Sequence, residues 1–225
     1  MADTSMETME TDAEQCSLRP MLCELNILTR SDGSALLTQG GTAVVASVHG
    51  PVEVRLQHLS VEKAHVEIYF RPRSGLGSVN DRLLENLIRN TYESTILTAL
   101  HPRAAVSIQL QEMQDHGGLI ACAINAVCLA LINSGIEMRY LVGAVHSVLD
   151  ADGRIWLDPD ELRSKDAQAR FTFVFDNVSK KTVSIYTHGR FTPEQYHRAL
   201  RLGTVAVDQV FEFYREIVAK QAKGL

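Results

Sequence analysis

The chain has 225 residues, of which 45% are apolar and 22% charged, so it can bury a core as one domain and is not a wholly disordered protein. Its formal charge of −5 comes from an N-terminal stretch with five acidic residues and no Lys or Arg. The remaining 22 acidic residues balance the 22 basic ones, so bulk charge argues neither for nor against a nucleic-acid partner.

Targeting and metal-binding patterns are missing from the sequence. The N-terminus has no basic segment followed by an apolar core, and no run of about 18 apolar residues suggests a membrane span. The cysteines have neither a CxxC pair nor the Cys/His spacing of a zinc site: Cys16, Cys23, Cys122 and Cys128. We therefore expect a soluble intracellular protein with free thiols, no metal, no cofactor and no membrane partner.

The first 17 residues contain the near repeat MET-MET-T, acidic and small polar residues, and no aromatic residue. Such a segment cannot bury enough apolar surface to offset its chain entropy, so residues 1–17 are predicted to be a disordered acidic tail. Residues 18–225 are predicted to be a single domain.

The first part of that domain alternates apolar and polar residues, which predicts β-strands. Strands are expected at residues 21–29, 35–39, 42–48, 52–59 and 64–70, with a hairpin around Gly40-Gly41. They would form a β-meander. Further strands are expected at 105–112, 139–149, 154–157, 170–175 and 182–186.

Three helices are predicted from periodicity and capping. Ser78 and Asp81 form a capping box before apolar residues at three- and four-residue spacing. Residues 119–134 are apolar nearly all round and stop at Gly135, as expected for a central helix. Thr192-Pro193-Glu194-Gln195 starts a C-terminal helix. The order of elements predicts an α/β or α+β layered fold, with β-sheets packed against central helices and a C-terminal helix.

Two segments could bind an anion or a metal. Gly117-Gly118 opens the central helix and could offer N–H groups to a phosphate, but Leu119 and Ile120 follow where a guanidinium would be needed, which favours a tight turn. The acidic cluster Asp158, Asp160, Glu161 and Asp166 could bind magnesium or act as a general acid. The alternative, which we favour, is a solvated turn that caps a small helix with Pro159 at its first position.

Arg71 and Arg73 end a predicted strand beside the loop at residues 74–77. They could contact RNA phosphates, or simply lie on a solvated loop.

The chain resembles the RNase PH family from about Leu18 to Tyr214. The matching segments are DGSA at 32–35, GGTAVVASVHGP at 40–51, LIRNTYE at 87–93, HPR at 101–103, DHGGLIACAINAVCLAL at 115–131, LDPD at 157–160 and FTFVFDN at 171–177. Within the family these segments are most similar to the non-catalytic ring subunits of the eukaryotic RNA exosome.

The resemblance implies a phosphorolytic site that has lost key groups. Active members place two arginines on the first helix, where this chain has Asn86 and Arg89, and another after Gly-Gly, where it has Ile120. Of the two carboxylates after the strand, Asp158 matches the first and Ser164 replaces the second. Asp158 and Arg89 would thus be remnants of the family site, and Arg71, Arg73 and Arg89 candidate RNA contacts.

Our hypothesis is a non-catalytic structural subunit of the exosome ring that supports 3′ to 5′ RNA processing and degradation. Its expected partners are other RNase PH-type subunits in a hexameric ring, the RNA-binding cap proteins of that ring, and RNA. Nucleus, nucleolus and cytoplasm are the expected compartments. One alternative is an active phosphorolytic or metal-dependent nuclease that uses Asp158, Asp160 and Asp166, and another is a stand-alone homo-oligomeric RNA-binding protein.

Overall fold

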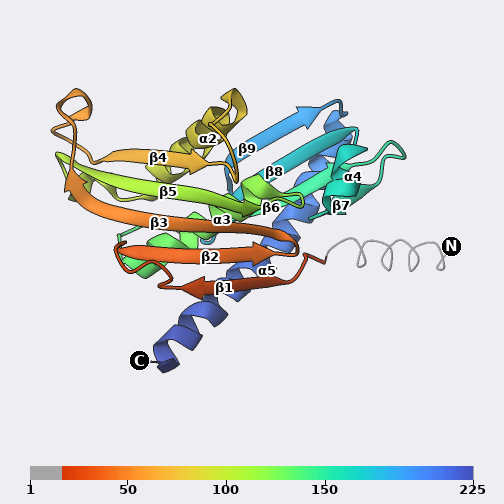
Figure 1. Ribbon diagram of the computed structural model, residues 1–225. Coiled ribbons are helices and arrows are strands. Elements are labelled where there is room, and N and C mark those ends of the chain that lie inside the picture. The colour runs from red at the N-terminus through yellow and green to blue at the C-terminus, as the bar shows by residue number, and fades with distance from the viewer. Residues whose placement is uncertain (1–16, 225) are drawn as a thin grey trace.

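The computed structural model describes residues 17–224 as two β-sheets and their covering helices (Figure 1). The first sheet has the order β1 (Met21–Leu25), β2 (Gly33–Gln39), β3 (Thr42–Glu53), β5 (Ala104–Gln114), β4 (His65–Arg71). The second has the order β7 (Ile155–Leu157), β6 (Val142–Leu149), β8 (Ala169–Asp176), β9 (Thr182–Gly189). The helices are α2 (Val79–Thr95), α3 (Leu119–Ser134), α4 (Glu161–Lys165) and α5 (Pro193–Gly224), with short 3₁₀ turns η1 (Leu56–His58) and η2 (Thr98–Leu100).

Helix α3 is the centre of the fold because it contacts both sheets, β2 and β3 on one side and β6 on the other. Eleven of its residues are buried, in agreement with the all-round apolar sequence. Helix α5 packs on β6 and β8, and Figure 1 shows it running the length of the molecule to the C-terminus. The predicted α/β layering is confirmed.

Helix α3 lies so close to the first sheet that Gly33 cannot carry a side chain. A Cβ there would lie 2.4 Å from the Ala130 carbonyl oxygen, which is backbone and cannot move aside. The helix stops at Gly135, whose φ of +73° is readily adopted by glycine. The predicted bounds of this helix, 119–134, are therefore correct.

Both predicted capping boxes form. The Ser78 side chain accepts from the Asp81 N–H, and the Asp81 carboxylate accepts from the Ser78 N–H. Thr192 and Gln195 make the equivalent pair of bonds at the start of α5. The small helix predicted from Pro159 starts instead at Glu161, since Asp160 is its extended N-cap.

The predicted meander fails after β3. The strand expected at 52–59 is wrong, because β3 ends at Glu53 and the chain turns at η1. Strand β4 does not pair with β3; it pairs in parallel with β5, and α2 makes the crossover between them. The parallel pairing follows from that crossover, which returns the chain in the same direction.

The thiols that the structure describes are free, with Cys122 and Cys128 buried and Cys23 half-buried. Burial raises the pKa of each to about 12, so all three are neutral at pH 7. Cys16 and the predicted acidic tail, apart from Ser17, lie outside the described residues. None of the helices in the described part of the chain is long and apolar enough to cross a membrane.

A buried amide joins α3, β6 and α5. Asn125 donates to the Ala144 carbonyl at 3.0 Å and accepts from the Ala144 N–H at 2.7 Å. Tyr214 of α5 donates to the same Asn125 oxygen at 3.0 Å. Strand β7 pairs with β6 only at residues 147–149, so Asn125 supplies hydrogen bonds that a longer neighbouring strand would have made.

We predict that Asn125→Ala lowers the free energy of unfolding by about 3 kcal/mol, because it leaves the buried N–H and carbonyl of Ala144 without their partner, while Tyr214 keeps the Val142 carbonyl as an acceptor. Tyr214→Phe, which removes one donor, should cost about 1 kcal/mol. Urea unfolding followed by circular dichroism would measure both. Equal losses for the two variants would contradict this account of Asn125.

Candidate functional site

A hollow of about 540 Å³ opens where the first turn of α3 meets the second sheet. We call it the α3 hollow. Its floor is one face of that sheet, where cross-strand pairing places Arg170 beside His188 and Thr172 beside Tyr186 and His146. Its walls come from α2, from the start of α3 and from α4: Asn80, Leu83, Leu84, Asp115, Gly117, Gly118, Leu119, Ile120, Glu161, Ser164 and Lys165.

The Gly117-Gly118 turn has the conformation of a tight backbone turn. Both residues have positive φ, and a Cβ on Gly117 would lie 2.9 Å from the Pro159 carbonyl oxygen. The polar groups of Gly117 are already used: Asp115 accepts from the Gly117 N–H, and Thr42 donates to the Gly117 carbonyl. The interpretation of Gly-Gly as a packed turn therefore accounts for these residues.

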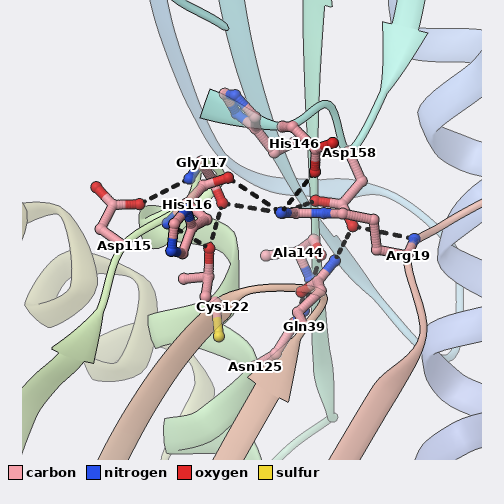
Figure 2. Close-up of polar contacts among 12 residues, drawn as sticks. Arg19, Gln39, Asp115, His116, Gly117, Cys122, Asn125, Ala144, His146 and Asp158 are labelled. Atoms are coloured by element: carbon pink, nitrogen blue, oxygen red, sulfur yellow. Dashed lines mark hydrogen bonds and ion pairs between the residues drawn. The ribbon is translucent and has the colours of Figure 1, made fainter. Parts of the chain in front are cut away.

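Asp158 lies beside this turn, across the Arg19 guanidinium from Gly117, and is 2% exposed (Figure 2). The Arg19 guanidinium is 2.6 Å from one carboxylate oxygen, while Gln39 donates to the other at 2.8 Å and the Arg19 N–H does so at 3.2 Å. Both oxygens are therefore occupied by groups of the chain itself. Asp158 is not among the residues that line the α3 hollow.

Arg19 also binds the turn above it, through the His116 carbonyl at 3.1 Å and the Gly117 carbonyl at 2.9 Å. Burial opposes the charge of Arg19, but the hydrogen bond and charge of Asp158 outweigh that cost and raise the pKa of Arg19. One guanidinium thus joins the segment before β1, the start of α3 and the turn after β7.

The other aspartates do not join Asp158 in a metal site. Asp160 is exposed and 3.6 Å from Arg19, and Asp166 is exposed at the end of α4. Within residues 17–224, no three His, Cys, Asp or Glu side chains are grouped so that they could hold a metal ion. The geometry that the metal-dependent alternative requires is therefore not formed by the described residues.

Arg89 is not brought together with Asp158, contrary to the expectation that both are remnants of one site. The residues of α2 that line the hollow are Asn80, Leu83 and Leu84. Arg89 is nine residues, or two and a half helical turns, after Asn80, so the two residues lie on opposite faces of α2. The face that carries Arg89 is near His65 and Tyr69 of β4. Asn86 accepts from Arg89 at 3.4 Å and does not line the hollow either.

The residues that α2 and α3 contribute to the walls of the α3 hollow are neutral. Ile120, which stands where active members are expected to have an arginine, lines the hollow. Ser164 of α4, which stands where they are expected to have a carboxylate, lines it as well. The cations come instead from Lys165 and Arg170. Lys165 is paired with Glu161 at 2.6 Å, and Arg170 donates through Nε to the Ser164 carbonyl at 3.0 Å.

Sequence reasoning missed the floor of the hollow and missed Arg19. The floor had a usable signal, because Phe171, Phe173 and Phe175 alternate with Arg170 and Thr172 and therefore predict a polar face. Arg19 had none, since its partner Asp158 is 139 residues away in the chain.

Arg71 and Arg73 line a second hollow of about 660 Å³ between the end of β4 and the start of α2. We call it the loop hollow. Arg82 of α2, which the sequence did not single out as an RNA contact, lines it as well. The two arginines that were expected to lie together therefore do so, and a third joins them.

Comparison with known proteins identifies the family. Residues 17–137, more than half of the chain, match the RNase PH model, described as the 3′ exoribonuclease family, domain 1. The chain belongs to the RNase PH family. Its fold agrees: the crystal structure of rice Rrp46 superposes with a TM-score of 0.86 at 32% identity, covering 89% of this chain and 95% of that one.

RNase PH relatives of similar length are also found among curated sequences. The exosome complex exonuclease RRP46 homolog of Arabidopsis thaliana is 31% identical over 92% of this chain and 96% of its own. The exosome complex component Rrp41 of Archaeoglobus fulgidus is 29% identical over 91% of this chain and 83% of its own. An archaeal exosome core structure shares the fold with a TM-score of 0.79 at 15% identity.

We predict that Arg19→Met lowers the free energy of unfolding by about 3–5 kcal/mol, because Asp158 would keep a buried charge without its partner. Asp160→Asn is the matched control and should cost less than about 1 kcal/mol, since Asp160 is exposed. Trp156, the only tryptophan, is two residues before Asp158, so its fluorescence would report the unfolding. A loss below 1 kcal/mol for Arg19→Met would refute the structural role of the pair.

The burial of His146 predicts that the free energy of unfolding depends on pH. It is 7% exposed on the hollow floor, and burial lowers its pKa from 6.5 to about 4. The unfolded chain therefore binds this proton at a higher pH than the folded one, so stability falls as pH drops from about 6.5 to 4. By urea unfolding at pH 7.5 and pH 4, wild type should lose about 3 kcal/mol more than His146→Gln does. Parallel losses in the two proteins would exclude His146 as the source.

Proposed function

We propose that this chain is a structural subunit of an RNA exosome ring, supporting 3′ to 5′ RNA processing and degradation without phosphorolytic activity of its own. The observation that carries the proposal is the state of Asp158, whose two carboxylate oxygens are held by Arg19 and Gln39. Asp158 is not among the residues that line the α3 hollow. It therefore acts as a structural group.

The neutral helix positions at the α3 hollow support the loss of activity. In phosphorolysis, inorganic phosphate attacks the terminal linkage of RNA, and positive charge must hold that phosphate. Asn80, Leu83 and Ile120 offer none, which leaves Arg170 and the Glu161-paired Lys165 as the cations of the hollow. Each lost contact to a developing anion costs about 3–4 kcal/mol, or a hundred- to thousand-fold in rate, so several such losses together abolish turnover.

The relatives support the assignment to a ring. The plant, archaeal, worm and fission yeast relatives are all named as parts of exosome complexes. The plant relatives carry the word exonuclease in their names, so the proposed loss of activity rests on the residues of this chain. A ring built from different subunits lets one of them lose chemistry and keep its interfaces.

The proposed partners are other RNase PH-type subunits in a hexameric ring, its RNA-binding cap proteins, and RNA. The loop hollow supports an RNA contact, since Arg71 and Arg73 lie together there with Arg82. Guanidinium groups of this kind can hold backbone phosphates without reading sequence. Arg89 faces β4 and is left out of the proposed contact. Nucleus, nucleolus and cytoplasm stay predictions.

The proposal is tested by mixing the purified chain, alone and co-assembled with RNase PH-type subunits, with 3′-extended RNA and phosphate. We expect no nucleoside diphosphate from the isolated chain, and a monomer that enters a larger ring when partners are present. Chromatography of the nucleotides and light scattering of the protein measure the two outcomes.

Two results would contradict the proposal. Diphosphate release that is lost in a folded Arg170→Gln variant would mean that the floor of the α3 hollow supports catalysis. A discrete dimer or hexamer that binds RNA and ignores ring subunits would favour the homo-oligomeric RNA-binding alternative.

A further inference from the structure

The loop hollow holds a serine beside its three arginines. Ser74 lies in segment 72–78 between β4 and α2, which is neither helix nor strand and is exposed from residue 73 on. Arg71, Arg73 and Arg82 line the same hollow. A phosphate group attached at this serine would therefore sit within a hollow that already presents guanidinium groups.

The carboxylates that line the loop hollow form no ion pair with these arginines. Glu85 accepts from the Phe70 N–H at 2.8 Å, and Asp81 accepts from the Ser78 N–H at 2.6 Å. Among the described residues, none of the three arginines makes an ion pair. Their donors are thus available to an added anion.

The sequence around Ser74 suits an arginine-directed serine kinase. Arg71-Pro72-Arg73-Ser74 places guanidinium groups three residues and one residue before the hydroxyl. Charge patterns of this kind are one way in which kinases select substrates. The segment is exposed and irregular, so it can enter a kinase cleft without unfolding a helix or a strand.

Ser78, the N-cap of α2, is the other serine that lines the loop hollow, and its polar groups are already engaged. Its Oγ accepts from the Asp81 N–H and its own N–H donates to the Asp81 carboxylate. A phosphate there would compete with the capping box that starts α2. No hydrogen bond to the Ser74 hydroxyl is formed by the described residues, so its modification breaks no such contact.

We propose that Ser74 is a phosphorylation site and that the phosphoserine docks on the guanidinium groups of the loop hollow. The kinase transfers the γ-phosphoryl group of ATP to Ser74 Oγ; the bond from Pγ to the ADP oxygen breaks, the Pγ–Oγ bond forms, and the hydroxyl proton passes to the catalytic carboxylate of the kinase. The added charge of about −2 then fills the surface that the proposed function gives to RNA, so phosphorylation weakens that contact.

The first experiment treats the folded full-length chain with ATP and the catalytic subunit of cyclic-AMP-dependent protein kinase. We expect one phosphate at Ser74 by peptide mass spectrometry, and none there in Ser74→Ala. A synthetic peptide of residues 69–78 is the control for sequence recognition. Phosphorylation of the peptide but not of the folded chain would overturn the proposal.

The second experiment tests docking by ³¹P NMR titration of the phosphorylated chain. Phosphoserine has a second pKa of about 6, and nearby guanidinium groups should lower it by about 0.5–1 relative to the phosphorylated peptide. Arg82→Gln, which leaves the kinase sequence intact, should move this pKa back toward the peptide value. Arg103→Gln, a change outside the hollow, should not. A pKa equal to that of the peptide, unmoved by Arg82→Gln, would refute docking.

These outcomes are independent of the exosome assignment. The site and its docking can be present in a chain that fails to join a ring, and a ring can form from a chain that no kinase modifies.

Discussion

The buried charge of Asp158 is the constraint around which the centre of this structure is arranged. A carboxylate that is 2% exposed must be neutralised from inside the protein, and Arg19 does so across 139 residues of sequence. The same guanidinium takes the carbonyls of His116 and Gly117, so the start of α3 is positioned by the group that compensates the charge. Asp158 thereby acts as a structural anchor for the start of α3.

Local physics explains what could be predicted from the sequence. The capping boxes at Ser78 and Thr192 and the stop at Gly135 depend on residues within four positions of each other, and each lies where expected. The strand expected at 52–59 and the helix start at Pro159 were local errors, and the other failures were non-local. The pairing of β4 with β5, the rotation of Arg89 away from the hollow and the partner of Asp158 depend on segments far apart in the chain.

The residues that line the two hollows also divide into those that local sequence predicts and those that only the fold brings together. Arg71 and Arg73 were expected together because they are two residues apart, and Arg82 joined them only through the approach of α2 to the end of β4. The α3 hollow combines β6, β8 and β9 with three helices, so no single segment of sequence describes it. Its floor, with Arg170 beside His188, becomes visible only once the strand register is known.

Helix α3 lies between two sheets with eleven buried residues, and it occupies most of 115–131, one of the segments in which the chain resembles the family. Each of the eleven buried residues is constrained by close packing, independently of which residues form the first turn. A substitution that removes a catalytic group from the first turn of α3 does not change the packing constraints on the remaining turns. Sequence similarity in this helix therefore reflects the volume and shape that packing requires. Such similarity can persist whether or not the protein is catalytically active.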